Sequence, residues 1–365
     1  MKKIAICTGG GDAPGLNAVI RAVTHSALRL GWEVFGIRDG LRGLLFPGDY
    51  PDGGMVKLDR KAVKGITHLG GTILGSTNRD DPTRFPRRQP DGSLLYEDIT
   101  GQVAEDFKRL GIDALVSVGG DGSMKIAARL AEHGLPVVGV PKTIDNDLDA
   151  TIATFGFDTA VQFACECIDR LHSTAASHQR VMVVEVMGRY AGWIALEAGL
   201  AGTADIILLP ELPYNIDSVL AKVQQRHSAG ASGFTLLVVA EGAFPAQGSR
   251  SVIETPENSN ERLGGVAEKL AADIRAATGF DTRFVVLGHL LRGGAPTARD
   301  RNLSLRFGAA AVRALDEGTH GVMVALDPPR VRYVPLEQVA GRMKLVPLDS
   351  DTVLTCRALG ICLGD

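Results

Sequence analysis

Residues 3–30 read KIAICTGGGDAPGLNAVIRAVTHSALRL, and this stretch decides the class of fold. The short apolar run Lys3–Thr8 predicts a strand, and the residues from about Gly15 to Leu30 predict a helix. The same order returns where the predicted strand Ala114–Val118 leads through Gly119–Gly122 into a second helix. Strands that alternate with helices are typical of parallel sheets, so we expect an α/β fold with doubly wound sheets.

Further segments have the composition of strands, and several are almost entirely apolar: Glu33–Ile37, Pro136–Val140, Gln179–Glu185, Ile206–Leu209, Thr235–Ala240 and Thr282–Leu287. Continuous apolar runs are typical of strands that are buried on both faces. The segment Ser76–Thr100 is polar and contains three prolines, so we expect a long surface excursion there. A chain of 365 residues predicts about two domains, and we place the domain change after Asp147.

The composition excludes several classes of protein. The net charge of −3 argues against a nucleic-acid partner, and the apolar runs are too short to span a membrane. The five cysteines form no CxxC pair, so neither a disulfide framework nor a zinc site is indicated. We therefore expect a cytoplasmic protein. The 44 glycines are about 12% of the chain, where about 7% is typical, which indicates loops that approach a ligand closely.

The first glycine-rich loop, Thr8–Gly15, joins a predicted strand to a predicted helix. Backbone N–H groups at the start of a helix bind phosphate well, because the helix dipole is positive there. Two other interpretations stay open for this loop. It is also compatible with a dinucleotide-binding loop, with Asp39 at the end of the second strand as the ribose ligand, or with a tight turn of no functional importance.

The second loop, Gly119–Ser123, places Asp121 among glycines, where it has little to pack against. A carboxylate beside phosphates favours a Mg²⁺ ligand, although an N-cap aspartate is the alternative. The third segment, PKTIDND at 141–147, has Asp145 and Asp147 two residues apart. In an extended chain they would point to the same side, and two close carboxylates suit one of them to act as a general base. An Asx turn is the alternative for this segment.

The motifs GGGDAPG at 9–15, GGDGS at 119–123 and PKTIDND at 141–147 resemble, in their order and spacing, those of the phosphofructokinase family. Later segments agree with that family's sugar-phosphate site: Ser177–Arg180, Val186–Arg189, Glu241, Thr282–Arg283 and Gly288–Gly294. The resemblance covers about residues 3–325. GGDG alone occurs in other kinases, whereas TIDND followed by MGR is specific.

The resemblance implies two Rossmann-like domains with mostly parallel sheets and an active site in the cleft between them. Residues 1–156 plus about 291–335 would form the larger, nucleotide-binding domain. Residues 157–290 plus about 336–365 would form the smaller, sugar-phosphate-binding domain. The implied reaction transfers the γ-phosphoryl group of ATP, with Mg²⁺, to the 1-hydroxyl of fructose 6-phosphate, a step of glycolysis. The physics agrees, because phosphoryl transfer needs alignment and charge neutralisation more than covalent chemistry.

The family's functional residues carry over position by position. Asp145 would be the general base, Asp147 would orient the site, and Asp121 would bind Mg²⁺. The nucleotide phosphates would be held by Gly11, Arg79, Gly119, Gly120, Gly122 and Ser123. Thr143 and Arg189 would face the transferred group. The sugar phosphate would contact Thr143, Ile144, Asp145, Met187, Gly188, Arg189, Glu241, His289 and Arg292. Arg180 and Arg283 would reach it from a neighbouring subunit, which implies a homo-oligomer, either a dimer or a tetramer.

Two positions bear on the phosphoryl donor. Pyrophosphate-using relatives carry Asp at the position of Gly122, and that carboxylate takes the space of the ATP α-phosphate, so Gly122 favours ATP. Lys142 is instead shared by pyrophosphate enzymes and by a mixed-donor branch of longer bacterial enzymes, which this chain resembles. The alternative is therefore a pyrophosphate-dependent phosphotransferase.

Alternatives of other classes are a Rossmann-type oxidoreductase, supported by Asp39 alone, and a non-catalytic sensor of nucleotides or sugar phosphates. Regulation is a separate expectation. His25 and His172 stand at two positions that are basic in allosteric relatives, and Ala229–Gly233 lacks the lysines expected there. We therefore expect weak or absent activation by ADP and weak inhibition by phosphoenolpyruvate.

Overall fold

The computed structural model describes residues 2–228, 233–250, 252–254 and 262–365. The chain forms two compact units, and it passes from one to the other several times. The first unit contains Met1–Thr143, Leu148–Gly156 and Arg292–Met343. The second unit contains Ile144–Asp147, Phe157–Leu291 and Lys344–Asp365.

The first unit is built on a seven-stranded sheet in the order β15-β14-β7-β6-β1-β2-β3. Its five central strands are parallel: β14 (Val322–Asp327), β7 (Val137–Pro141), β6 (Ala114–Gly119), β1 (Lys3–Thr8) and β2 (Glu33–Ile37). An antiparallel strand closes each edge, β3 (Met55–Leu58) beside β2 and β15 (Arg330–Pro335) beside β14. The predicted parallel, doubly wound class of fold is confirmed.

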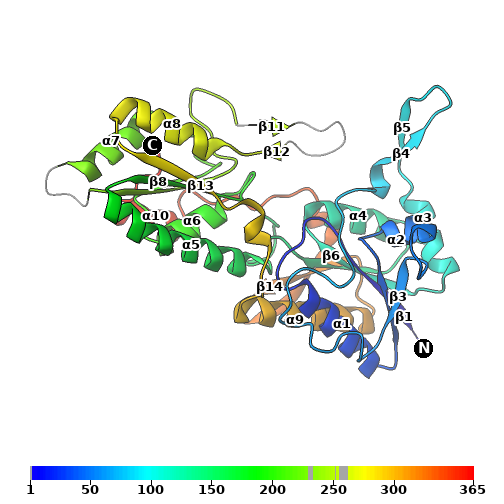
Figure 1. The fold of residues 1–365 in the computed structure, drawn as a ribbon. Coiled ribbons are helices and arrows are strands. Elements are labelled where there is room, and N and C mark those ends of the chain that lie inside the picture. The colour runs from blue at the N-terminus through cyan, green and yellow to red at the C-terminus, as the bar shows by residue number, and fades with distance from the viewer. Residues whose placement is uncertain (1, 229–232, 251, 255–261) are drawn as a thin grey trace. The chain divides into compact units, whose positions relative to one another are not determined.

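Helices cover both faces of this sheet because its strands are apolar on both sides (Figure 1). Ile4 and Ile6 of β1 pack into a core with α1 (Leu16–Arg29) and α9 (Ala298–Asp316). The alternate residues Ala5 and Cys7 point to the other face, where the core includes side chains of α3 (Thr100–Arg109) and α4 (Asp121–Glu132). A short helix, α2 (Arg42–Leu45), follows β2.

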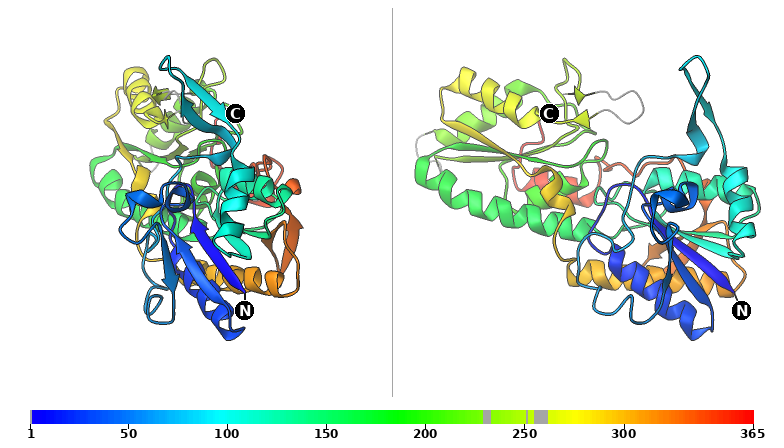
Figure 2. Two further views of the ribbon diagram at one scale, coloured as in Figure 1. Left: turned by 90° about the vertical axis from the view of Figure 1, so that its right-hand side faces the viewer. Right: turned by 45° about the vertical axis from the view of Figure 1, so that its right-hand side comes forward.

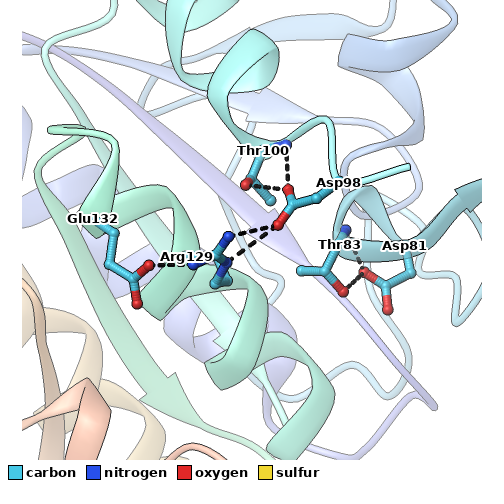
Figure 3. A network of polar contacts seen from close by, with 6 residues as sticks. All are labelled: Asp81, Thr83, Asp98, Thr100, Arg129 and Glu132. Carbon is cyan, nitrogen blue, oxygen red and sulfur yellow. Dashed lines mark hydrogen bonds and ion pairs between the residues drawn. The ribbon is translucent and has the colours of Figure 1, made fainter. Parts of the chain in front are cut away.

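The polar segment predicted as a surface excursion contains a small hairpin. Its strands β4 (Phe85–Arg88) and β5 (Leu94–Glu97) pair in antiparallel fashion, and they extend from the body of the unit (Figures 1 and 2). At the base of the hairpin, Asp98 accepts hydrogen bonds from Thr100 and binds Arg129 of α4 at 2.8 Å (Figure 3). The excursion is therefore tied to a helix of the main body.

The second unit has a four-stranded parallel sheet in the order β13-β8-β10-β9. Its strands are β8 (Val181–Val186), β9 (Ile206–Leu208), β10 (Thr235–Ala240) and β13 (Thr282–Val286). Side chains of α7 (Ile216–His227) and α8 (Val266–Thr278) share a core with one face. The remaining helices of the unit are α5 (Phe157–His178), α6 (Trp193–Ala201) and α10 (Asp351–Ala358), and β11 (Val252–Glu254) pairs with β12 (Arg262–Leu263).

Two sequence expectations need correction. The strand predicted at Gln179–Glu185 begins at Val181, because α5 continues to His178 and Gln179 adopts a left-handed conformation with φ of 51°. The segment Thr143–Asp147 is not extended, because Asn146 also has a positive φ, 51°. The simple alternation that would place Asp145 and Asp147 on one side therefore does not apply.

Candidate active site

The three motifs of the first unit follow three neighbouring strands. The loop Gly9–Gly15 follows β1, the loop from Gly120 follows β6, and Lys142 follows β7. These strands are adjacent and parallel, so their carboxyl ends lie at one edge of the sheet, where ligands bind in such folds. Backbone bonds join the loops, from Gly9 N–H to Val118 O and from Lys142 N–H to Gly119 O, both 2.9 Å long. The motifs therefore form one continuous surface.

Side chains of the site stand against the glycine backbone of these loops, and at Gly119 the short Ser123 side chain leaves no room for a Cβ. A Cβ at Gly11 would lie 2.8 Å from Arg292 Nη1, and one at Gly119 would lie 2.0 Å from Ser123 Oγ. Gly122 differs, because no atom other than those of its chain neighbours and its own helix backbone would lie within 4 Å of a Cβ there. The space beside Gly122 is open, which bears on the choice of donor.

Two cations support the first loop. Lys142 is only 3% exposed, and its Nζ donates a hydrogen bond to the carbonyl of Gly11. Arg292 Nη1 donates to the carbonyl of Asp12 at 3.2 Å. The segment before Arg79 meets this loop too, since Gly10 N–H donates to Thr77 O at 2.9 Å, and the Arg79 side chain is exposed. Positive charge therefore surrounds a loop whose N–H groups suit an anion.

Asp121 is the first residue of α4, where a carboxylate complements the helix dipole. One of its oxygens lies 2.6 Å from Lys125 Nζ, and the other accepts the Gly341 N–H at 2.8 Å. Its side chain is 34% exposed, so it is open to ligands. Within the described ranges, no three His, Cys, Asp or Glu side chains gather into a metal cage. A single accessible carboxylate fits Mg²⁺, which proteins commonly bind through one or two carboxylates and phosphate oxygens.

Ile144–Asp147 belongs to the second unit, where Lys344 holds it. The Lys344 Nζ donates to Asn146 Oδ1 and its N–H donates to the carbonyl of Asp147, both at 2.9 Å. Ile144 is fully buried, whereas Asp145 and Asp147 are half-buried. The segment is thus anchored at the adjacent residues Asn146 and Asp147, and the side chains of Asp145 and Asp147 have intermediate exposure.

The other predicted residues of the second unit also gather at a sheet edge. Met187, Gly188 and Arg189 follow β8, and Glu241 follows the adjacent β10. Gly242 N–H donates to Gly188 O at 3.1 Å, and a Cβ on Gly242 would lie 1.9 Å from Arg189 O. On the other side of β8, Leu287 N–H donates to Glu185 O at 2.9 Å, and the exposed His289 comes two residues later. Arg189, Glu241 and His289 therefore come from one edge of the sheet.

These motifs agree with a comparison across the whole chain. The family model described as phosphofructokinase matches residues 3–315. The chain belongs to the phosphofructokinase family. It is 50% identical over 364 residues to the ATP-dependent 6-phosphofructokinase of Chloroflexus aggregans, an alignment that covers 100% of this chain and 98% of that one. It is also 47% identical over 348 residues to the pyrophosphate–fructose 6-phosphate 1-phosphotransferase of Streptomyces coelicolor, with 94% and 96% covered.

Solved phosphofructokinases share the fold. The structure from Saccharomyces cerevisiae is 33% identical and has a TM-score of 0.76, with 93% of this chain aligned. This chain spans 45% of the length of that yeast chain. A pyrophosphate-dependent phosphofructokinase from Nitrosospira multiformis, 23% identical, gives a TM-score of 0.80 over 100% of this chain and supports the fold alone.

Membership of the phosphofructokinase family leaves the dinucleotide interpretation without support. Asp39 accepts a hydrogen bond from the Tyr50 hydroxyl at 2.8 Å. Burial, followed by the hydrogen bond to Asp39, raises the pKa of Tyr50 to about 12, so the tyrosine stays a donor. This carboxylate is therefore used within the fold.

Arg180 and Arg283 lie at the opposite end of the second sheet from Arg189. Arg180 precedes β8 and Arg283 is the second residue of β13, whereas Arg189 follows the end of β8. Six strand residues at about 3.3 Å each separate the two ends by roughly 20 Å. Within one chain the structure therefore does not bring these two arginines to the site residues.

Asp281 holds both of these arginines, and the motifs did not identify it. Its two oxygens lie 2.5 Å from Arg180 Nε and 3.0 Å from Arg283 Nε. The hydrogen bond from Arg180, opposed by partial burial, lowers the pKa of Asp281. Lys344 was missed as well, because the C-terminal tail has no readable motif. Asp281 was the easier one to find, since it lies two residues before Arg283 in a charged run.

The residues tied to regulation are only partly described. His172 Nε2 lies 2.8 Å from the carbonyl of Gly202 and 3.1 Å from Thr203 Oγ1. His25 is half-buried in α1, where burial and then Arg21 lower its pKa. Residues 229–232 of the predicted Ala229–Gly233 segment lie outside the described residues. In the parts of the chain that are described, none of the helices is long and apolar enough to cross a membrane.

Proposed function

We propose that this chain transfers the γ-phosphoryl group of ATP to the 1-hydroxyl of fructose 6-phosphate. The observation that carries the proposal is the meeting of the loops after β1, β6 and β7 at one sheet edge, with glycines where side chains press on the backbone. Full-length relatives named as ATP-dependent 6-phosphofructokinases, at 48% and 50% identity, support it. Nucleotide binding is assigned to the first unit and most of the sugar-phosphate binding to the second. A cytoplasmic location goes with this proposal.

Asp145 is assigned as the base that accepts the proton of the attacking hydroxyl. Its anchored segment supports this role, because a base must be held within hydrogen-bond reach of the proton it takes. Asp147 orients the site from the same segment. Thr143 and Arg189 face the transferred group, where the guanidinium offsets the charge that spreads over the phosphoryl oxygens.

Asp121 would hold Mg²⁺ together with phosphate oxygens of the nucleotide. When bound, the ion neutralises charge on the phosphates. The protein's own contribution is binding and orientation: N–H groups of Gly11 and of the Gly119–Ser123 loop cradle the phosphates, and Arg79 is exposed close by. Lys125 keeps the Asp121 side chain directed along the start of α4.

The sugar phosphate is assigned to Ile144, Met187, Gly188, Glu241, His289 and Arg292, with Thr143 and Asp145 at its reacting end. Arg180 and Arg283 are assigned to the site of a neighbouring subunit. Their place at the far end of the second sheet, and the salt bridges with Asp281 that hold them together, support this arrangement. The active enzyme is therefore a homo-oligomer.

Gly122 supports ATP as the donor, because the space around it is open where a larger side chain would exclude the nucleotide. Pyrophosphate is the second candidate, since Lys142 is buried against the phosphate loop and one relative at 47% identity carries a pyrophosphate name. The test is an initial-rate assay with each donor on fructose 6-phosphate and on sedoheptulose 7-phosphate. We expect turnover with ATP and fructose 6-phosphate. Turnover with pyrophosphate and none with ATP would contradict the assignment based on Gly122.

A further inference from the structure

The first unit has a surface cavity that shares no residue with the motifs above. It measures about 570 Å³ and is lined by residues of α9 and by the segment that begins β15 (Arg330–Pro335). Three of its lining residues are arginines, Arg306, Arg313 and Arg330, and the rest are apolar. The cavity is a surface depression that is wide open to solvent, with a volume in the range of small-ligand sites.

The three arginines reach the cavity from two elements. Arg306 and Arg313 are seven residues apart on α9, which is two helical turns, so they lie on the same face. Arg330 is the first residue of β15. Arg306 Nη2 donates to the carbonyl of Pro329 at 2.8 Å, and this bond ties the helix side of the cavity to the β15 side.

The lining has no carboxylate to balance these charges. Nearby, Asp327 lies 3.9 Å from Arg332 Nε, and Glu317 is hydrogen-bonded with Tyr333, as is Arg313. Arg306, Arg313 and Arg330 are therefore the only charged residues among those that line the cavity, while Asp327, the register partner of Arg330, and Glu317 lie outside the lining. Bringing like charges together is unfavourable unless an anion joins them, and the arginine fork matches the oxygens of a phosphate.

The remaining wall of the cavity is apolar, since Leu305, Pro329 and Val331 line it beside the arginines. An inorganic anion alone would make no contact with this apolar wall. We propose that the cavity binds a phosphate-bearing small molecule with an apolar face, of the nucleoside diphosphate class. The phosphates bind Arg306, Arg313 and Arg330, and the base lies against the apolar wall.

The test compares the number of ADP molecules bound per chain by isothermal titration calorimetry. The wild type is compared with R306Q/R313Q and with R330Q. Neither variant changes a residue that is assigned to catalysis or to substrate binding. R29Q is the matched control, because Arg29 is an exposed arginine at the end of α1 in the same unit. Pyrophosphate and adenosine serve as probes for the phosphates alone and for the base alone.

We expect R306Q/R313Q to bind one ADP fewer per chain than the wild type, or to bind that ADP at least about tenfold more weakly. R330Q should weaken the same site, and R29Q should bind as the wild type does. All variants should retain the basal turnover. Binding of pyrophosphate but not ADP would overturn the nucleoside class and leave an inorganic anion site. Identical stoichiometry and affinity in the wild type and R306Q/R313Q, or an equal loss in R29Q, would overturn the proposal itself.

Discussion

Asp145 lies in a four-residue segment that Lys344 fastens through Asn146 and Asp147. We expect Asp145→Asn to lower kcat by at least about 10²-fold, because a positioned base contributes at least that much to a proton transfer. The KM for fructose 6-phosphate should change little. Steady-state kinetics check this, with Asp149→Asn as a control of the same charge change nearby. Near-native kcat in Asp145→Asn would show that another group takes the proton.

A substitution at Gly122 tests whether this position determines the choice between ATP and pyrophosphate as donor. Because no side chain and no other segment lies within 4 Å of a Cβ there, Gly122→Asp should fold normally. We expect its kcat/KM for ATP to fall at least about tenfold, since like charges placed together cost several kcal/mol. Gly122→Asn has the same size without the charge and separates repulsion from crowding. Equal kcat/KM for ATP in Gly122→Asp and the wild type would remove the argument from this position.

At the level of single residues, the sequence predicted which segments lie at the sheet edges better than it predicted their local geometry. The glycines and Asp121 could be placed at a sheet edge because they lie in strand–loop–helix motifs, whereas Arg292 was expected only from the family resemblance. The bend at Asn146 could not be predicted, because a positive φ at a non-glycine residue depends on tertiary contacts such as the one from Lys344. Lys344 itself lies some 200 residues further along the chain, in a region without a pattern.

The connection between α3, α4 and the hairpin depends on Asp98 (Figure 3). Burial opposes ionisation of this carboxyl, but hydrogen bonds from Thr100 and the ion pair with Arg129 outweigh it and lower the pKa from 3.8 to about 2. A carboxyl whose pKa is lower in the folded state stabilises the fold above its unfolded pKa. That contribution is lost as the pH falls from about 4 to about 2.

We therefore expect Asp98→Asn to lower the free energy of unfolding by about 1 kcal/mol at neutral pH, after allowance for solvent screening. The difference from the wild type should shrink below pH 4. Urea unfolding at several pH values measures this. Glu132→Gln is the matched variant, because it removes a more exposed partner of the same arginine, and it should change the midpoint little. A difference that is independent of pH would mean that the Asp98 contacts are not electrostatic.

Among the elements, central strands were the most predictable and edge strands the least. The strands β1, β6, β7 and β10 are buried runs of aliphatic residues, and their pattern is clear in the sequence. The antiparallel edges β3 and β15 have exposed positions and mixed composition, so no apolar pattern marks them. The hairpin β4–β5 was predicted only as a polar excursion, because its two strands are short and mostly exposed and have no buried apolar pattern.

At the scale of the whole molecule, the excess of glycine now has specific physical causes. Gly11 and Gly119 leave room for the side chains of Arg292 and Ser123. The space beside Gly122 is not filled by any side chain of the protein. The net charge of −3 does not conflict with anionic substrates, because positive side chains gather locally: Lys142 and Arg292 lie beside the first glycine-rich loop, and three arginines line the cavity beside α9. Such gathering depends on the fold, and composition alone does not show it.

The arginine pair at the far end of the second sheet makes a prediction about assembly. If Arg283 serves a neighbouring subunit, each site takes Asp145 from one subunit and Arg283 from the other. Asp145→Asn and Arg283→Ala then each remove a contribution from a different subunit. Each variant alone should be nearly inactive. Mixed oligomers would contain some sites with an intact Asp145 from one chain and an intact Arg283 from the other.

Co-expression of the two variants in equal amounts should therefore restore about a quarter of the wild-type activity in a dimeric arrangement, because half of the randomly formed pairs are hybrids with one intact site each. Arg180→Ala should complement in the same way, and Asp281→Asn should raise the KM for fructose 6-phosphate because it releases both arginines. The matched control is co-expression of Asp145→Asn with Arg189→Ala. Because Arg189 is assigned to the same subunit's site as Asp145, no hybrid site is intact in that mixture and its activity should stay at the parental level. Activity of the Arg283→Ala mixture that equals the sum of its parents would place Arg283 in its own subunit's function instead.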